Sequence, residues 1–170
     1  MSGRPRCPWA EADPLLARYH DEEWGVPVPG DAAHFERLSL EVFQAGLSWR
    51  TILHKRAAFR RAFGRFSPRR VAAFTEADVR RLLGDAGIVR NRKKIEATIE
   101  NARRLLALSK AHGSFARWLA SLPGGRRELC RALRDAFRFM GPKIAGSYLE
   151  SVGRVPPRHH PRCWRAKRGA

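Results

Sequence analysis

The sequence predicts an all-α protein. Its informative segments carry apolar residues at helical spacing, and none alternates apolar and polar residues as a half-buried strand does. Proline and glycine clusters at 26–30, 122–125 and 155–157 separate these segments. A length of 170 residues favours one domain, which we expect at 1–164, followed by a basic, flexible tail at 165–170.

Capping residues mark where several helices are expected to begin. Asp31 is the expected N-cap of the first long helix. Ser67 before Pro68 is typical of an N-cap followed by proline at the first helical position. Thr75 and Asp78 have the spacing of a capping box. The apolar spacing predicts helices at 31–46, 48–63, about 91–108 and about 126–139, with short ones after 67 and 75.

The charge is strongly positive. Lysine and arginine number 34 against 16 acidic residues, which gives a formal net charge of +18. A coding bias towards arginine would explain arginine over lysine, but it does not explain a twofold excess over acids. The excess predicts a polyanionic partner, with nucleic acid as the first candidate.

Three cysteines argue against a disulfide framework. The N-terminal residues lack the apolar core of a signal peptide, and no apolar run approaches membrane-spanning length. We therefore expect a soluble monomer that has no membrane partner and works in the cytoplasm, in association with the nucleoid.

Two cysteines and two histidines near the chain ends form a candidate metal site. Two thiolates and two imidazoles are a standard tetrahedral zinc shell, and this one would fasten the two termini together. His160 is an alternative to its neighbour His159. Without a metal, Cys7 would be a small buried apolar residue and His20 a hydrogen-bonded helix histidine. Cys130 is interpreted as core packing. The candidate set is Cys7, His20, His159 and Cys163.

A glycine-containing turn at 82–95 joins two helical patterns, and the second helix begins among four positive charges. Helix N-termini bind phosphate through free N–H groups, and basic side chains add charge. A plain connection with a solvated basic face is the alternative. The candidate DNA-contacting residues are Gly87, Arg90, Arg92, Lys93 and Lys94.

Four aromatic residues and one acid come from separated segments of the first fifty residues. Electron-rich rings hold a flat cationic ligand, and a carboxylate adds hydrogen bonding and charge attraction. For each ring taken alone, core packing is the better interpretation. The candidates are Trp9, Tyr19, Trp24 and Trp49, with Glu41.

Stretches that contain these residues resemble the DNA-3-methyladenine glycosylase I family of bacterial repair enzymes. The resemblance covers nearly the whole chain in register, and YHDEEWGVP and QAGLSW are its most specific parts. The matching stretches are RCPW at 6–9, DPLLARYHDEEWGVP at 13–27, LEVFQAGLSWRTILHKR at 40–56, GIVRNRKKI at 87–95, ENARRLL at 100–106, FRFMGP at 137–142 and HHPRC at 159–163.

The resemblance implies a compact helix-hairpin-helix glycosylase bundle with its termini joined by a structural zinc. It implies a monofunctional enzyme of base excision repair that flips 3-methyladenine out of duplex DNA and removes it by hydrolysis. Glu41 would recognise the base, with activation of water as an alternative role, and Trp49 would stack on it. Trp9, Tyr19 and Trp24 would form the pocket walls, and the zinc ligands would be Cys7, His20, His159 and Cys163.

Four positions depart from the family pattern and leave the range of substrates open. They are Leu16 in place of a tyrosine, Val42 in place of a glycine, Lys143 in place of a threonine and Gly146 in place of an aromatic residue. Three rival functions remain: a glycosylase that also nicks the strand through a lysine, a damage-binding module without catalysis, and a general RNA-binding protein.

Overall fold

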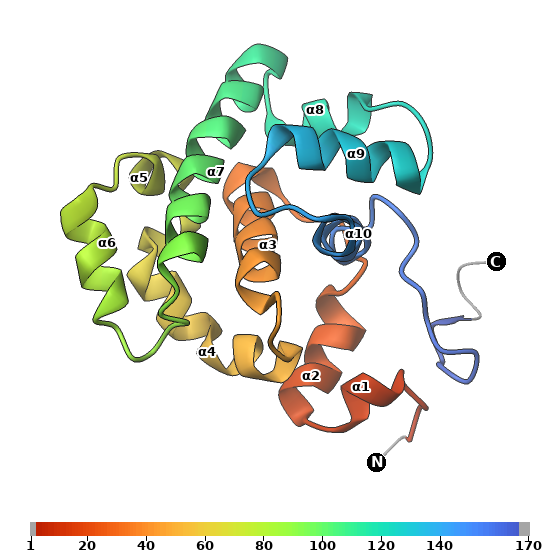
Figure 1. The fold of residues 1–170 in the computed structure, drawn as a ribbon. Coiled ribbons are helices and arrows are strands. Elements are labelled where there is room, and N and C mark those ends of the chain that lie inside the picture. Colours follow the sequence, from red (N-terminus) through yellow and green to blue (C-terminus); the bar gives the residue numbers. More distant parts are fainter. Residues whose placement is uncertain (1–2, 167–170) are drawn as a thin grey trace.

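The computed structural model describes residues 3–166, and these fold into helices with no strand among them (Figure 1). The all-α prediction is therefore confirmed. The elements are α1 (Pro8–Glu11), α2 (Pro14–Arg18), the π-helical turn η1 (Tyr19–Glu23), α3 (Gly30–Gln44), α4 (Trp49–Ala62), the 3₁₀ turn η2 (Gly64–Phe66), α5 (Pro68–Ala72), α6 (Glu76–Leu83), α7 (Arg92–His112), α8 (Phe115–Ser121), α9 (Arg126–Ala136) and α10 (Pro142–Ser151).

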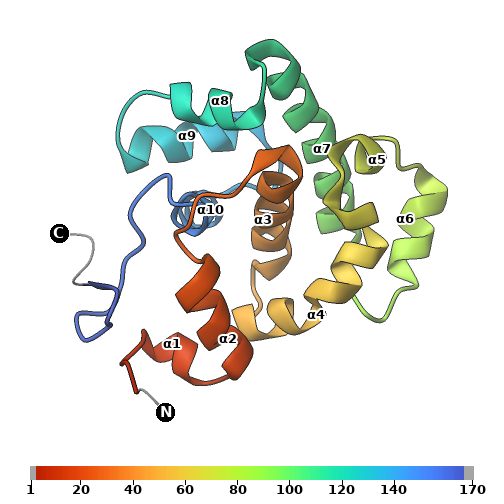
Figure 2. The ribbon, with the colours of Figure 1, turned by 180° about the vertical axis from the view of Figure 1, so that it is seen from behind.

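Helix α3 runs through the middle of the molecule and packs against α4, α7, α8 and α10 (Figures 1 and 2). Buried residues occupy every position from 37 to 43, so this helix is enclosed on all sides over its second half. Phe35, Leu38 and Phe43 are fully buried in the main core. Because α3 is fixed from every side, the residues at its C-terminal end have set positions.

The caps of the short helices form as expected, and the cap of α3 does not. Thr75 N donates to Asp78 Oδ2 at 2.9 Å in the capping box of α6, and Ser67 caps α5. The prediction that Asp31 caps α3 is wrong, because the helix begins at Gly30. Asp31 instead accepts hydrogen bonds from Ser109 Oγ and the Phe115 backbone N–H, and so ties α3 to α7 and α8.

The two chain ends meet beside α1 and η1. Figures 1 and 2 show the segment after α10 running back along the N-terminal helices, and Trp164 N donates to Pro5 O at 2.8 Å. A second, smaller apolar cluster forms there, containing Cys7, Leu16, Tyr19, Trp24, Leu53 and Cys163.

Arg165, which we expected to be the first residue of a flexible tail, is bound to the folded part of the chain. Arg165 Nη1 donates to the carbonyl oxygens of His20 and Trp24, so this residue is held against η1. The rest of the expected tail, 167–170, lies outside the described residues. Among the described helices, none combines the length and the hydropathy that crossing a bilayer requires.

Candidate functional site

Cys7, His20, His159 and Cys163 come together at the junction of the chain ends. Their ligand atoms all lie within 4.8 Å of one another. Cys163 Sγ is 3.4 Å from His20 Nε2 and 3.5 Å from His159 Nδ1. Three of the four residues are buried, so this cluster is a preformed set of donors that could hold a metal ion.

The surroundings of the cluster suit ligation. His20 Nδ1 lies 2.8 Å from Asp21 Oδ1, which orients the ring so that Nε2 faces the cluster. The backbone N–H groups of His160 and Arg165 point at the sulfur atoms of Cys7 and Cys163. Burial lowers the pKa of His159 to about 4, so its ring is neutral at pH 7 and keeps a lone pair for a metal.

The structure also separates the two neighbouring histidines. His159 Nδ1 faces both cysteine sulfurs, whereas His160 Nδ1 accepts a hydrogen bond from Arg162 N at 3.2 Å. His159 is therefore the member of the cluster, as the resemblance implied.

Next to this cluster lies a cavity of about 150 Å³ with aromatic walls. The Trp9 and Trp24 rings stand perpendicular, with centroids 5.2 Å apart. Trp24 also touches the metal cluster, since its ring lies 4.8 Å from the His159 ring. The residues that line the cavity are Trp9, Trp24, Glu41, Trp49, Ser147 and Glu150.

Tyr19 does not line this cavity. Its side chain is only 2% exposed and lies behind Trp49, with ring centroids 5.4 Å apart. Its hydroxyl accepts a hydrogen bond from Arg37 Nη1 at 3.3 Å. The resemblance implied that Tyr19 forms part of the pocket wall. In the structure it lies behind the Trp49 ring and supports it.

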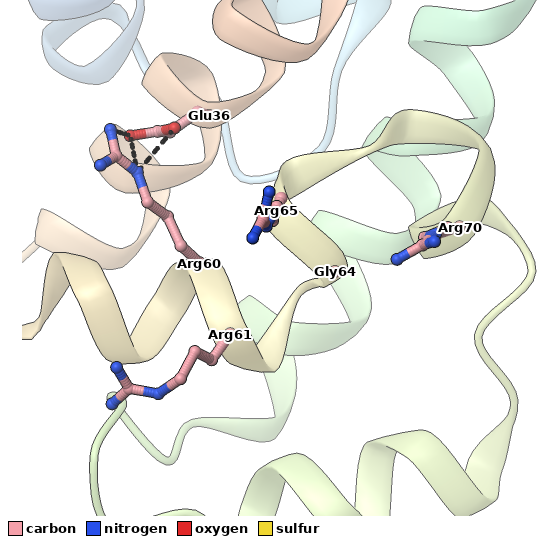
Figure 3. A pocket seen from close by; sticks show the side chains of 6 residues that line it. All are labelled: Glu36, Arg60, Arg61, Gly64, Arg65 and Arg70. Atoms are coloured by element: carbon pink, nitrogen blue, oxygen red, sulfur yellow. Dashed lines mark hydrogen bonds and ion pairs between the residues drawn. The ribbon is translucent and has the colours of Figure 1, made fainter.

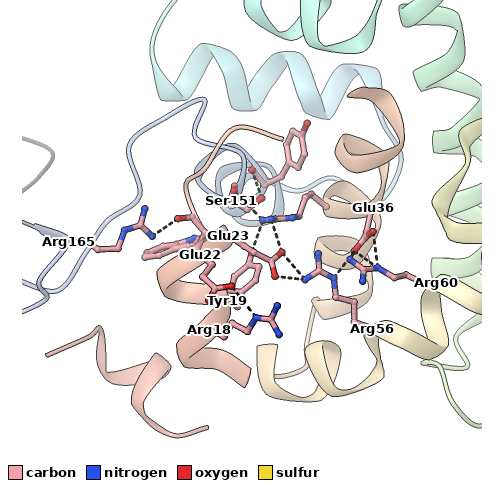
Figure 4. Close-up of polar contacts among 12 residues, drawn as sticks. Arg18, Tyr19, Glu22, Glu23, Glu36, Arg56, Arg60, Ser151 and Arg165 are labelled. Carbon is pink, nitrogen blue, oxygen red and sulfur yellow. Dashed lines mark hydrogen bonds and ion pairs between the residues drawn. The ribbon is translucent and has the colours of Figure 1, made fainter. Parts of the chain in front are cut away.

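A partly buried ionic network connects the elements next to the cavity (Figure 4). Arg37 on α3 donates to Tyr19, to Glu23 and to the Ser151 carbonyl of α10. Arg56 on α4 donates to both oxygens of Glu23. The network therefore connects η1, α3, α4 and α10, the elements that surround the cavity.

Glu41 is the buried acid of the cavity. Its side chain is 2% exposed, and within the described residues its carboxyl group has no hydrogen-bond partner. Burial raises its pKa to about 8, Glu150 adds to this rise and Arg37 opposes it, so the group is mostly protonated at pH 7. The carboxyl oxygens face the cavity, where a ligand can reach them.

Ser147 and Glu150 are members of the cavity wall that sequence reasoning missed. They lie three residues apart on α10, which places them on one face of that helix. The only signal in the sequence that could have indicated these two residues is their helical spacing.

The hairpin between α6 and α7 packs against α4. A Cβ atom on Gly87 would lie 2.9 Å from Ala58 Cβ, so glycine permits this close approach. Arg90 and Lys93 are exposed at the start of α7. Arg92 is also exposed but forms ion pairs with Glu76 and Glu96.

Lys94 differs from the other basic residues of the hairpin. It is only 5% exposed, and its Nζ donates to Phe43 O at 2.9 Å and to Ala45 O at 2.6 Å. These carbonyl groups lie at the C-terminal end of α3, just before the turn that leads to Trp49. The expectation that Lys94 contacts DNA is therefore corrected, because its ammonium group faces the protein and holds this turn.

A larger, open hollow of about 610 Å³ lies at the far end of α4 and is lined mainly by arginines (Figure 3). Its only acid, Glu36, is paired with Arg60 at 2.8 Å. No aromatic ring lines it, so it lacks the features of a base pocket and extends the positive surface. The lining residues are Glu36, Arg60, Arg61, Gly64, Arg65 and Arg70.

Comparison with known proteins finds methyladenine glycosylases. The family model described as methyladenine glycosylase matches residues 9–133. The chain is 40% identical to DNA-3-methyladenine glycosylase 1 of Escherichia coli (strain K12), with 88% of this chain and 91% of that protein covered. It is 34% identical to DNA-3-methyladenine glycosylase of Haemophilus influenzae (strain ATCC 51907 / DSM 11121 / KW20 / Rd), with 88% and 92% covered.

Solved structures that resemble this fold are also 3-methyladenine DNA glycosylases. A crystal structure of 3-methyladenine DNA glycosylase I superposes with a TM-score of 0.85 at 39% identity, covering 94% of this chain and 98% of that one. The Staphylococcus aureus enzyme, solved to explain 3-methyladenine recognition, gives a TM-score of 0.80 at 34% identity, with 89% and 92% covered.

The helical fold and its aromatic, acid-containing cavity, together with these similarities, define a DNA glycosylase of the all-helical type. Within that class, the chain belongs to the methyladenine glycosylase family.

Proposed function

We propose that this chain removes 3-methyladenine from alkylated double-stranded DNA by hydrolysing the N-glycosidic bond, and that it does not nick the strand. The observation that carries the proposal is the unpartnered carboxyl group of Glu41 in an aromatic cavity. The names of the relatives in Escherichia coli and Haemophilus influenzae support the choice of base.

The cavity suits a single flat base. Its volume of about 150 Å³ is well below that of sites for drug-sized ligands. A nucleotide flipped out of the duplex would place its base between the indole rings, with Trp49 stacking on it. The mostly protonated Glu41 carboxyl group can donate one hydrogen bond and accept another at the edge of the base.

The chemistry needs little acid catalysis. An adenine methylated at N3 in DNA is cationic, so it leaves as a neutral base when the bond to C1′ breaks. Water then adds to C1′ and loses a proton, which leaves an abasic sugar. The pocket's contribution is to select the cationic base and to stabilise the positive charge that develops on the sugar.

For the metal cluster we propose zinc in a structural role. Two thiolates and two imidazoles are a donor set that zinc prefers, and the four ligand atoms already converge. Cys7, His20, His159 and Cys163 would hold the ion and fasten the chain ends. All four coordination positions would be filled by protein, so the metal would take no part in the reaction.

DNA would be held mainly by its phosphates. Arg90 and Lys93 are exposed at the start of α7, where helix N–H groups add to the attraction. We propose that they and the backbone near Gly87 grip one strand, that the protein acts as a monomer, and that it works in the cytoplasm on nucleoid DNA.

The first test is release of free base from methylated duplex DNA. We expect the wild type to release 3-methyladenine, and Glu41→Ala and Trp49→Ala to reduce the rate by at least about a hundredfold, since each removes a contact to the flipped base. Glu22→Ala, which changes an exposed acid, is the matched control and should retain the wild-type rate.

Tight DNA binding without any base release would contradict the proposal and indicate a damage-binding module. Trapping of a covalent adduct on abasic DNA by borohydride would contradict the monofunctional mechanism, because borohydride reduces the Schiff base that a strand-nicking amine nucleophile forms with the abasic sugar.

A further inference from the structure

The cavity contains a second carboxyl group, that of Glu150, which the mechanism above does not use. Glu150 lies in the last turn of α10, and its side chain is 13% exposed. It lines the cavity together with Glu41 and Trp49. A half-enclosed acid facing a ligand cavity needs an explanation, because burial of a carboxylate is unfavourable unless a partner compensates it.

The compensating partner is Arg126. Its Nη1 contacts Glu150 Oε1 within hydrogen-bonding distance. Arg126 is the first residue of α9, where the helix dipole disfavours a positive charge. The position of this guanidinium is therefore explained by the pair with Glu150 and not by the stability of α9.

Gly146 provides the space for this pair. A Cβ atom at position 146 would lie 2.5 Å from Arg126 Nη2, so any other residue there would displace the guanidinium. Gly146, Arg126 and Glu150 thus form one interdependent arrangement at the wall of the cavity.

The pair leaves part of Glu150 available to a ligand. Arg126 contacts Oε1, and within residues 3–166 Oε2 has no hydrogen-bond partner. Glu41, the other acid of the cavity, is mostly uncharged at neutral pH. The Oε2 atom of Glu150 therefore adds an unengaged acceptor to the cavity wall, beside Glu41.

We propose that Glu150 is a second base-recognising residue, which attracts the positive charge of an alkylated purine and accepts a hydrogen bond from its amino group through Oε2. Arg126 is a positioning residue that holds Glu150 at the wall. The inference rests on the proposed function and adds a second acid to the one that the family resemblance implies.

The test compares two purines that differ in charge. The first probe is the 3,9-dimethyladeninium ion, in which a methyl group at N9 replaces the sugar and the ring is cationic. The second is neutral 9-methyladenine. Binding is followed by quenching of tryptophan fluorescence, since Trp9, Trp24 and Trp49 line the cavity.

We expect Glu150→Gln to weaken binding of the cation about tenfold, as loss of a charged hydrogen-bond partner does, and to change binding of the neutral purine less than about twofold. Glu22→Gln, an exposed acid paired with an arginine, should leave both affinities unchanged. An unchanged affinity of Glu150→Gln for the cation would overturn the inference.

A double variant separates recognition from an indirect effect. In Glu150→Gln alone, the unpaired Arg126 could repel the cation by itself. Glu150→Gln with Arg126→Met removes that repulsion, and we expect the cation to remain weakly bound. Full recovery of cation binding in the double variant would show that Glu150 only neutralises Arg126, and would overturn the inference.

Base release by the same proteins distinguishes failure of the Glu150 inference from failure of the proposed function. If the wild type releases 3-methyladenine and Glu150→Gln does so with unchanged kcat/KM, the inference fails and the proposed function stands. If the wild type releases no base, the proposed function itself fails.

Discussion

The carboxyl group of Glu41 shows how a single residue acquires its properties from its neighbours. It lies at the enclosed end of α3 and lines a cavity together with three tryptophans. Burial therefore holds the proton on the group up to a pH of about 8, against an ordinary value of 4.5. A group of this kind exchanges hydrogen bonds with a base without adding a full charge.

This shift predicts a pH-dependent stability. Because the folded pKa is raised, the stability that Glu41 contributes is fully present below pH 4.5 and is lost as the pH rises to about 8. Glu41→Gln cannot ionise, so we expect its Tm to gain on that of the wild type between pH 5 and pH 8.5. The gain should be at least about 2–4 °C, equivalent to roughly 1 kcal/mol. Parallel Tm curves for the two proteins would contradict this prediction.

At the scale of elements, the hairpin between α6 and α7 both presents charge and supports the pocket. Lys93 and Lys94 are adjacent on α7, yet one is exposed and the other is buried against the end of α3. The direction of each side chain follows from the turn of the helix. One short segment thus faces the solvent on one side and the turn before Trp49 on the other.

We expect substitution of Lys94 to lower stability and substitution of Lys93 to lower DNA affinity. Lys94→Met leaves two carbonyl groups of the α3 end without their donor, and we expect a loss of about 2–3 kcal/mol in the free energy of unfolding. Lys93→Met should unfold like the wild type but bind duplex DNA more weakly, with a smaller dependence on salt. Denaturant unfolding and DNA titration of both variants check this, and equal stabilities would contradict the assignment.

The contrast also shows where sequence reasoning stops. Apolar spacing and the caps at Ser67 and Thr75 are local signals, and these predicted α3 to α7 and α9, whereas the short helices α1, α2 and α8 were not predicted. Asp31 also carried a local signal, but its partners lie on α7 and α8, more than seventy residues away. For Lys94, likewise, the deciding contacts come from α3, and no local pattern reveals them.

In the site, too, some residues could be identified from the sequence and others only from the packing. The metal cluster and the acid at Glu41 depend on residue types that carry chemistry by themselves, and these could be selected from the sequence. Glu150 looks like any acid on a helix until α9 brings Arg126 to it. The roles of Tyr19 and Glu150 follow from which residues stand in the first layer around the cavity, and that is a property of packing.

At the scale of the whole molecule, the chain ends close on each other through the Cys/His cluster. The cluster touches the cavity directly, because Trp24 contacts His159 and Trp9 contacts His20. Loss of the cluster would therefore loosen the aromatic wall as well as the termini.

Removal of the metal should show that the aromatic wall and the chain ends depend on the cluster. If zinc is present at a hundredfold above its Kd, its loss costs about 2.7 kcal/mol, which corresponds to a fall in Tm of roughly 5–10 °C. We expect a strong chelator and Cys163→Ala to produce this fall together with weaker base binding. Cys130→Ala, a buried cysteine outside the cluster, is the control for the loss of a thiol. Metal analysis should find about one zinc per chain, and a metal-free protein of full stability would contradict the assignment.

The joining of the two ends also sets the order in which the molecule forms. The wall that contains Trp9 and Trp24 is completed by His159 and Cys163, and Cys163 lies 143 residues beyond His20, its partner in the cluster. Contacts over such a separation form slowly, because the intervening chain has to be brought together first. The helices therefore form before the molecule is able to hold a damaged base.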